Sequence, residues 1–373
     1  MMNQKIKDFF QRFLNPAGIR INGKRPWDLQ VHNDGFYDRV LKQGSLGLGE
    51  SYMDSWWDCE SLDEFFNRVI KADLGSKIRW DLKSYLFALK NILINQQRKS
   101  KAREVGQSHY DLGNDLYAAM LDPSLSYSCG YWSKAQNLAQ AQEAKLELIC
   151  RKLNLKAGDD VLDIGGGWGN FARYAAKKYG VHVDVVTVSR KQVELGKKLC
   201  ADLDVCFLLQ DYREIQGFYN HIISVGMIEH VGYKNYRTYM QTVADSLKDD
   251  GLFLLHTIGR NKSTRFNDRW IAKYSFVNSM LPSMRQLSKA IENLFVLEDL
   301  HSFGADYDRT LMVWFANFEK NWPDLREKYG DRFYRQWKYY LLSCAGAFRA
   351  RKNQVWQIVL SKNGVPGGYR SVR

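Results

Sequence analysis

The sequence predicts an α/β fold in which a seven-stranded sheet is covered by helices on both faces. Two observations predict it. From residue 160 onward, short apolar segments alternate with segments of helical periodicity, as expected where helices connect parallel strands. The first of these strands leads into a glycine-rich turn and then a helix, in the sequence VLDIGGGWG at residues 161–169. A small, mainly helical domain is predicted to precede this fold.

Strands are predicted, in chain order, at residues 160–164, 182–188, 205–210, 221–227, 252–258, 296–302 and 354–360. Helices are predicted between them, for example over residues 233–248, where Gly251 ends the helical pattern. Two helical segments, at about 307–322 and 331–350, separate the last two strands. A parallel sheet with a long helical excursion before its last strand resembles the Rossmann-like sheet of class I methyltransferases that use S-adenosylmethionine (SAM).

The first part of the chain contains helical patterns, such as residues 65–70 and 82–92, followed by a polar run at residues 96–105. We therefore expect a helical N-terminal domain over residues 1–95, with a role in membrane, lipid or dimer contacts. A linker over residues 96–105 and a SAM-dependent catalytic domain over residues 106–373 follow.

Residues 1–14 form an amphipathic pattern. The apolar face holds Ile6, Phe9, Phe10, Phe13 and Leu14, opposite Lys5, Lys7, Gln11 and Arg12. Such a helix either lies in the headgroup region of a membrane or docks on its own domain. The sequence leaves both interpretations open.

The net charge of +13 and the aromatic content of 14% fit a partner that is either nucleic acid or the anionic surface of a bilayer. No block of five like charges is present, so a nucleic-acid-binding arm is not supported. The six cysteines form no Cys-X-X-Cys pair, which is typical of a reducing compartment. The sequence shows no signal peptide and no apolar run of about 18 residues. We therefore expect a cytoplasmic protein with no nucleic-acid partner and no metal site.

The glycine-rich turn is the most informative motif. Gly165, Gly167 and Gly169 let the backbone bend tightly and approach a ligand, and the following helix favours a polar or anionic group at its N-terminus. A dinucleotide-binding loop, G-x-G-x-x-G/A, would need a small residue where Asn170 stands. The observed D-x-G-x-G-x-G spacing resembles the SAM loop of class I methyltransferases. The alternative is a purely structural turn in an α/β domain.

Ligands of parallel sheets bind beyond the carboxyl ends of the strands, so residues at these ends are candidates for the site. The candidates at the second to fifth ends are Thr187, Ser189 and Gln192, then Asp211 and Tyr212, then Glu229, and finally His256. The second end lacks the acidic residue that usually holds a ribose in methyltransferases. Asp211 and Tyr212 suit an adenine amine and an aromatic stack, respectively. Glu229 and His256 follow adjacent strands, so we expect them on the same edge of the sheet.

Several segments, in this order, resemble the cyclopropane fatty acid synthase family. They are QSHYDLGNDLY (107–117), LSYSCGYW (125–132), EHVG (229–232), HTIG (256–259), FGADYDRTL (303–311) and CAGAFRAR (344–351). The resemblance covers nearly the whole chain, including residues 44–57. Two positions depart from the family pattern. Gly166 stands where the family usually has Cys, and FVNSM at residues 276–280 replaces a commoner Phe-Pro-Gly/Asn-Gly, a change that affects the acyl-chain entrance rather than the chemistry.

The resemblance implies transfer of a methylene group from SAM to the cis double bond of unsaturated phospholipid chains, which forms cyclopropane chains. It also implies a bound bicarbonate as general base, which suits an oily pocket because desolvation raises the pKa of a side-chain carboxylate. The implied bicarbonate holders are Cys129, Glu229, His256, Tyr307 and the backbone N–H of Ile258. The implied SAM-binding residues are Tyr127, Ser128, Gly165, Gly167, Thr187, Gln192, Gln210, Asp211 and Tyr212. Glu229 either accepts a hydrogen bond from the bicarbonate hydroxyl or orients His256, and both roles stay open.

Single residues of this set also have structural interpretations. Cys129 is typical of a small buried apolar residue, His256 of a satisfied core histidine, and Tyr307 of a hydroxyl bonded to the backbone. Cys344 is a weaker candidate for a catalytic thiol, because the reaction needs no covalent enzyme intermediate.

The resemblance further implies a homodimer and peripheral association with the phospholipid bilayer at its inner face. The alternatives are a methyltransferase of a small amine, a lipid enzyme that adds a methyl branch, and a non-catalytic lipid-binding protein. Methylation of nucleic-acid bases is disfavoured, because residues 106–373 lack an Asn/Asp-Pro-Pro-Tyr/Phe motif.

Overall fold

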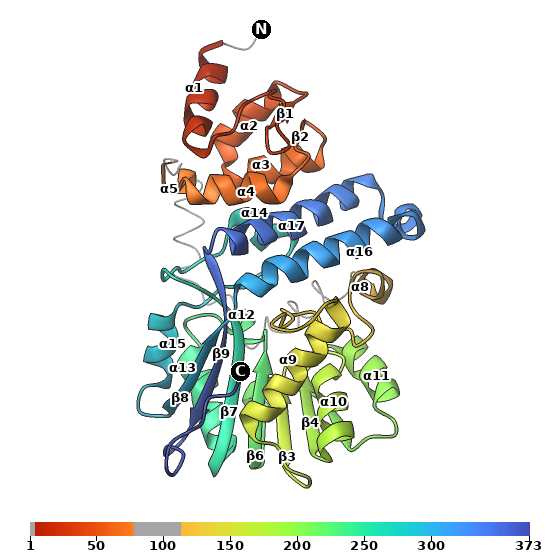
Figure 1. Ribbon diagram of the computed structural model, residues 1–373, viewed down its shortest axis with the longest axis vertical. Coiled ribbons are helices and arrows are strands. Elements are labelled where there is room, and N and C mark those ends of the chain that lie inside the picture. Colours follow the sequence, from red (N-terminus) through yellow and green to blue (C-terminus); the bar gives the residue numbers. More distant parts are fainter. Residues whose placement is uncertain (1–3, 78–112) are drawn as a thin grey trace. The chain divides into compact units, whose positions relative to one another are not determined.

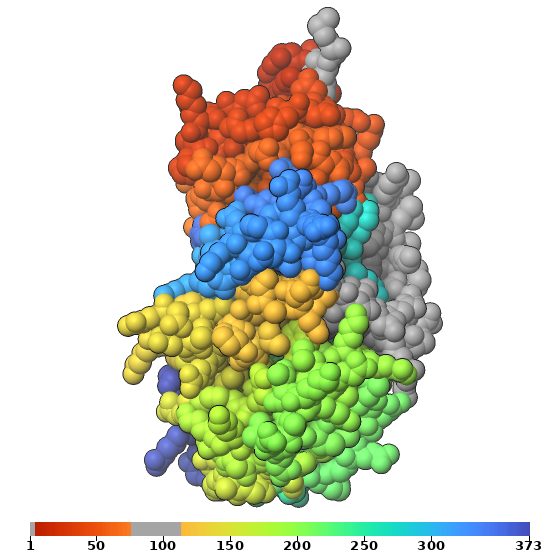
Figure 2. All heavy atoms as spheres, turned by 90° about the vertical axis from the view of Figure 1, so that its right-hand side faces the viewer, coloured from red at the N-terminus to blue at the C-terminus, as the bar shows by residue number. Residues whose placement is uncertain are grey.

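The structure is a computed structural model that describes residues 4–77 and 113–373, and the other residues are grey in Figures 1 and 2. It divides into two compact units. The first comprises Met1–Ile94, Phe266–Val277 and Tyr307–Asn353, and the second comprises Asn95–Arg265, Asn278–Asp306 and Gln354–Arg373. The predicted linker at residues 96–105 and the helical pattern at residues 82–92 lie outside the described residues.

The second unit contains a seven-stranded sheet with the strand order β5-β4-β3-β6-β7-β9-β8 (Figure 1). Its strands are β3 (Asp160–Ile164), β4 (His182–Thr187), β5 (Val205–Leu209), β6 (Tyr219–Val225), β7 (Leu247–Arg260), β8 (Val296–Ser302) and β9 (Asn353–Ser361). β3 pairs in parallel with β4 and β6, β4 with β5, and β6 with β7. The predicted α/β fold with seven strands is confirmed.

Two details of the predicted sheet are wrong. β8 and β9 pair antiparallel, so the sheet is mixed rather than parallel, because apolar patterning reports burial and not strand direction. β7 begins at Leu247, directly after helix α13 (Tyr236–Ser246), so Gly251 lies inside this strand instead of ending the helix. A Cβ at Gly251 would lie 2.5 Å from Asn220 O, which explains why the close approach of β6 requires glycine there.

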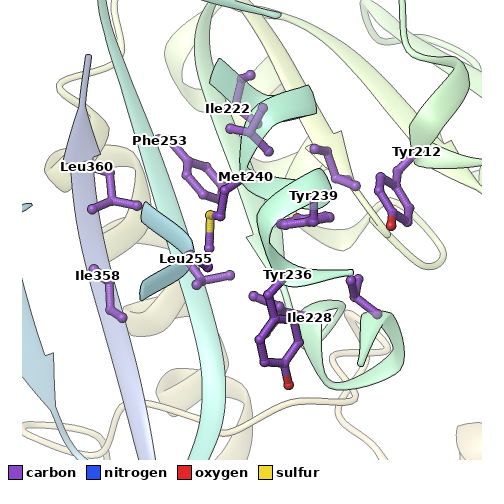
Figure 3. Packing of buried hydrophobic residues seen from close by; sticks show 14 of the residues in the cluster. Tyr212, Ile222, Ile228, Tyr236, Tyr239, Met240, Phe253, Leu255, Ile358 and Leu360 are labelled. Atoms are coloured by element: carbon purple, nitrogen blue, oxygen red, sulfur yellow. The ribbon is translucent and has the colours of Figure 1, made fainter. Parts of the chain in front are cut away.

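Helices cover both faces of the sheet. They are α8 (Asn114–Met120), α9 (Leu138–Leu153), α10 (Asn170–Tyr179), α11 (Arg190–Leu199), α12 (Ile228–Val231), α13 and α15 (Met284–Ile291). α9 and α10 share one core with Val161 of β3, whereas α13 and α15 share the opposite core with Leu162. Figure 3 shows part of this second core, around Met240, Phe253 and Leu255. Successive strand residues point to opposite faces. The apolar residues Val161, Leu162 and Ile164 of β3 therefore pack into both cores and fix its carboxyl end between them.

The first unit is mainly helical. Its elements are α1 (Gln4–Leu14), η1 (Asn15–Ala17), β1 (Gln30–Val31), α2 (Gly35–Gln43), α3 (Ser45–Met53), β2 (Trp57–Asp58), α4 (Leu62–Lys71), α5 (Leu74–Lys77), α14 (Arg269–Tyr274), α16 (Ala305–Tyr329) and α17 (Asp331–Arg349). α17 approaches α4 closely, since a Cβ at Gly346 would lie 2.4 Å from Asp63 O. Trp270 of α14 is fully buried against α3, where Gly49 leaves room for the indole ring. Three separate segments of the chain therefore build this unit, whereas the sequence suggested residues 1–95 alone.

α1 docks part of its apolar face within the first unit. Phe10 and Leu14 are buried, and the ring centroids of Phe10 and Tyr37 are 5.1 Å apart. Phe9, by contrast, is 49% exposed and stacks on Phe13. The helix therefore combines a docked face with an exposed aromatic edge. In the described part of the chain, no helix has both the length and the apolar character needed to cross a membrane.

Candidate active site

A turn of positive-φ glycines connects β3 to α10. Gly165, Gly167 and Gly169 have φ angles of 83°, 59° and 76°, a conformation that residues with a Cβ rarely adopt. A Cβ at Gly165 would also lie 3.0 Å from Met227 Cβ, whereas Gly167 faces open space. The turn needs glycine for its backbone, and Gly167 also leaves room for a ligand.

A pocket of about 910 Å³, solvent-open space included, lies at the carboxyl ends of β3, β4, β5 and β6. Six predicted SAM-binding residues line it, namely Gly165, Thr187, Gln192, Gln210, Asp211 and Tyr212. Thr187 Oγ1 donates a hydrogen bond to Gln192 Oε1 at 2.6 Å. Thr187 and Gln192 therefore form a hydrogen-bonded pair on the wall of the pocket, next to the carboxyl end of β4.

The third strand end presents Asp211 and Tyr212. The Asp211 carboxylate caps η2 (Tyr212–Glu214) and pairs with the Arg213 guanidinium at 3.1 Å. The Tyr212 hydroxyl is buried without a hydrogen-bond partner among the described residues. Burial raises the pKa of Tyr212 to about 12, so the hydroxyl is a neutral donor at pH 7.

A second pocket holds the remaining predicted SAM-binding residues. Tyr127, Ser128 and Gly167 line it, together with Gly165 and Gln192, which also line the first pocket. α9 holds the segment that carries Tyr127 and Ser128, because Gln142 Nε2 donates to Ser128 O and Lys145 Nζ donates to Ser128 Oγ, both at 2.8 Å. The structure thus brings all nine predicted residues to two pockets that share part of their walls.

Glu229 is a buried carboxyl on α12 with only one of its oxygens engaged. Oε1 accepts a hydrogen bond from the Ile258 N–H at 2.7 Å. Oε2 is buried and has no hydrogen-bond partner in the described part of the chain. Burial raises the pKa of Glu229 to about 7, and the Ile258 N–H opposes this only in part. The Ile258 N–H, predicted to face bicarbonate, therefore holds Glu229 in this structure.

His256 and Cys129 are also buried in the second unit. Gln357 Nε2 lies 3.4 Å from His256 Nδ1, and the Phe303 ring packs edge-on against the imidazole. Burial, reinforced by positive charges on α9, keeps the pKa of His256 well below its usual value, so the ring is neutral at pH 7. Cys129 Sγ donates to Gly130 O at 3.2 Å. His256 is thus a neutral group that can donate a hydrogen bond, whereas the Cys129 thiol is engaged by Gly130 O.

Two candidates belong to the first unit. Tyr307 lies on α16, is 7% exposed, and has its ring centroid 4.7 Å from that of Phe348. Cys344 is a half-buried cysteine on α17 that forms no disulfide among the described residues. The contact of Tyr307 with bicarbonate and a catalytic role for Cys344 stay predictions.

Sequence reasoning missed two buried charged residues that line the second pocket, Lys145 and Asp163. Lys145 and Lys152 are two turns apart on the apolar face of α9, and this spacing could have revealed them. A Cβ at Gly166 would lie 2.5 Å from Asp163 Oδ2. Gly166, the position where the resembled family usually has Cys, therefore gives the Asp163 carboxylate its room.

The residues present fit both SAM and bicarbonate. The open face of Gly167 and the unpartnered Tyr212 hydroxyl leave space and a donor for a ligand in the two pockets. Glu229 Oε2 is an acceptor that suits the hydroxyl of bicarbonate, while the neutral His256 ring can donate to its negatively charged oxygens.

Glu229 makes the stability of the protein pH-dependent. A carboxyl whose folded pKa is raised stabilises the fold fully below its unfolded pKa, near 4.5, and loses this contribution as the pH rises through about 7. We expect the free energy of unfolding of the wild type to fall by about 2–3 kcal/mol more than that of Glu229→Gln between pH 5 and pH 8. Urea unfolding at each pH measures this difference. Parallel curves for the two proteins would show that Glu229 ionises normally.

Comparison with known proteins identifies the family. Residues 97–358 match the mycolic acid cyclopropane synthetase family. The chain is 52% identical over 360 residues to the cyclopropane-fatty-acyl-phospholipid synthase of Escherichia coli strain K12. The alignment covers 96% of this chain and 94% of that relative.

Solved structures agree with this relationship. The mycolic acid cyclopropane synthase CmaA1, solved with SAH and CTAB, matches with a TM-score of 0.66 and 29% identity over 70% of this chain and 98% of that one. Coclaurine N-methyltransferase matches with a TM-score of 0.70 over 84% of this chain and 99% of that one, but at 18% identity it shares the fold alone. The chain therefore belongs to the mycolic acid cyclopropane synthetase family and is a SAM-dependent cyclopropane synthase.

Proposed function

We propose that this enzyme transfers a methylene group from SAM to the cis double bond of unsaturated acyl chains in membrane phospholipids, with bicarbonate as general base. The observation that carries the proposal is the buried Glu229 carboxyl, whose Oε1 is held by the Ile258 N–H while Oε2 lacks a partner among the described residues. The Escherichia coli relative, named for fatty acyl phospholipids, supports the substrate. CmaA1, solved with SAH, supports the methyl donor.

Bound SAM would supply an electrophilic methyl group. Bound bicarbonate would supply the base that removes a proton from this methyl group once it is attached to the acyl chain, so that the ring closes. Glu229 Oε2 accepts the hydroxyl of the anion, and the Ile258 N–H orients Glu229 for this contact. Neutral His256 and the Tyr307 hydroxyl donate to its other oxygens, and the Cys129 thiol would join them by turning its hydrogen away from Gly130 O, to which it bonds in this structure. Addition of the methyl group to the alkene leaves a positively charged centre on the acyl chain. The burial of these side chains keeps out water, which would otherwise react with this centre.

The two pockets divide the binding of SAM. Asp211 and Tyr212 take the adenine, and Thr187 with Gln192 takes the ribose. Tyr127, Ser128 and the glycine turn then bind the remaining part of SAM, with Gln210 completing the wall of the first pocket. Fixing both reactants in this way supplies much of the rate, because the methyl group and the alkene must approach within about 3–3.5 Å.

A turnover assay tests the function. The full chain is incubated with methyl-labelled SAM, bicarbonate and vesicles of a cis-monounsaturated phospholipid, and the acyl chains are read by mass spectrometry and NMR. We expect each product chain to gain the mass of one CH2 group, to lose its alkene protons and to show cyclopropane protons. A labelled chain that carries a methyl branch, or no label in lipid despite SAM binding, would contradict the proposal.

The exposed edge of α1 is proposed to contact the bilayer. Burying a Phe side chain contributes about 1.5–3 kcal/mol, so Phe9→Ser is expected to weaken binding to anionic phospholipid vesicles by roughly tenfold, measured by co-sedimentation. Leu41→Ser on α2 is the matched control, because Leu41 is also 49% exposed. Equal losses for the two variants would show that α1 has no special role.

The homodimer implied by the family resemblance stays a prediction. Analytical ultracentrifugation of the full chain tests it, and a sedimentation coefficient that corresponds to a single chain at all concentrations would contradict it.

A further inference from the structure

Lys145 is a buried cation whose observed hydrogen-bond partners are both uncharged. The residue is 1% exposed and lines the second pocket beside Gly165 and Gly167. Its Nζ donates to Ser128 Oγ and to Gln142 Oε1, each at 2.8 Å. Across residues 4–77 and 113–373, no carboxylate oxygen lies within 4.0 Å of this nitrogen.

Lys152, two turns along the same helix, shows the usual solution for a buried ammonium. It is also fully buried, but its Nζ lies 3.4 Å from Asp299 Oδ2, and Arg373 pairs with the same carboxylate. Buried charges in proteins are normally paired in this way, because removing an ion from water is costly. The difference between the two lysines therefore points to a missing counter-ion at Lys145.

Asp163 shares the pocket with Lys145 but neutralises it only in part. Burial raises the pKa of Asp163 to about 7 and lowers the pKa of Lys145 to about 8. Near neutral pH a substantial fraction of Asp163 is therefore protonated while Lys145 is mostly charged. The buried carboxyl of Asp122 also favours the charged form of Lys145, but neither Asp122 nor Asp163 forms an ion pair with it in the described part of the chain.

We propose that Lys145 is the counter-charge for a carboxylate-type anion bound in the second pocket. Two of its three ammonium hydrogens bond to Ser128 and Gln142, which leaves the third for the ligand. The inference rests on the proposed function, which supplies an anion of this chemistry for the pocket: the carboxylate of the methionine part of SAM. Bicarbonate, whose proposed holders do not line the second pocket, is the other source that the test distinguishes. In either case Lys145 connects the bound anion to the segment that carries Ser128 and Cys129.

Ligand binding, measured without turnover, tests the proposal. Lys145→Met keeps the apolar stem and removes the charge, and Lys152→Met is the matched control on α9. Calorimetry measures the affinity for S-adenosylhomocysteine and for 5′-methylthioadenosine, which lacks the amino-acid carboxylate. NMR of isotopically labelled bicarbonate measures the affinity for that anion.

If the carboxylate of SAM is the partner, Lys145→Met is expected to weaken S-adenosylhomocysteine binding at least tenfold and to leave 5′-methylthioadenosine binding within twofold. If bicarbonate is the partner, its binding alone weakens at least tenfold. In both cases Lys145→Arg retains the charge and restores most of the affinity, whereas Lys152→Met leaves the discrimination between ligands unchanged. Lys145→Gln replaces Lys145→Met in every comparison if the methionine variant does not fold.

Unchanged affinities for all three ligands in the folded variant would overturn the proposal. An equal loss for all three would overturn it as well, because it would mean that Lys145 only supports the shape of the pocket. The proposed function can fail separately: a wild type that binds these ligands with the expected selectivity, yet forms no cyclopropane chains, would contradict the reaction and not the role of Lys145.

Discussion

Glu229→Gln is expected to lower the rate of cyclopropane formation by about 10²–10⁴-fold, the range typical of a group that controls proton transfer. Glutamine has the shape of the carboxyl, and its amide oxygen can still accept the hydrogen bond that the Ile258 N–H makes with Oε1 at 2.7 Å. The amide nitrogen, however, replaces Oε2 and donates where the proposed bicarbonate hydroxyl needs an acceptor. The rate is measured as cyclopropane chains formed per enzyme in the vesicle assay.

The affinity for SAM separates this effect from a general loss of structure. Glu229 lines neither SAM pocket, so the dissociation constant of S-adenosylhomocysteine is expected to change by less than threefold. Glu147→Gln is the control, because Glu147 is a hydrogen-bonded carboxyl on α9 that accepts from Tyr174 and Tyr179. A rate for Glu229→Gln within tenfold of the wild type would remove Glu229 from the mechanism.

Trp270→Ala is expected to lower the free energy of unfolding by about 3–5 kcal/mol, the range for deleting a large aromatic side chain from a core. Trp270 is 1% exposed, and its ring centroid lies 4.5 Å from that of Tyr339 on α17. On its other side, a Cβ at Gly49 of α3 would lie 2.2 Å from the indole. One side chain therefore joins three distant segments of the chain, and its removal leaves a cavity that all three border.

Urea unfolding followed by circular dichroism measures this loss. Phe9→Ala is the control, because it removes an aromatic ring of the same unit that is 49% exposed, and it is expected to change stability by no more than about 0.5 kcal/mol. A cost below about 1.5 kcal/mol for Trp270→Ala would show that the segments 266–277 and 307–353 pack loosely in the first unit.

The strands of the sheet could be predicted where local signals suffice. β3 and β8 begin and end at the predicted residues, and for β3 the glycine turn that follows Ile164 marks its end in the sequence. The start of β7 could not be predicted, because the reason for Gly251 is the backbone of Asn220 on a neighbouring strand. The antiparallel direction of β9 and the partners of Trp270 likewise depend on contacts between residues far apart in the sequence.

The residues of the pockets could likewise be predicted only where local sequence signals suffice. The rule that ligands bind at carboxyl strand ends, together with the family resemblance, predicted Thr187, Asp211 and Tyr212 as site residues, and all three line the first pocket. Lys145 was missed because a lysine in a helix usually extends into water, and only the packing of α9 on the sheet encloses it. The engagement of the Ile258 N–H by Glu229 depends on side-chain placement, which no motif specifies.

The three-segment construction of the first unit has a consequence for biosynthesis. A ribosome completes α1 to α5 early, but α17 and the Trp270 segment, which cover their apolar surfaces, emerge only after most of the second unit has been translated. Until residue 353 leaves the exit tunnel, the nascent N-terminal helices lack the partners of buried residues such as Tyr52. Exposed apolar surface of this kind makes partly made chains prone to aggregation. The N-terminal unit begins first but finishes almost last, so chaperones that shield nascent chains have the most to protect there.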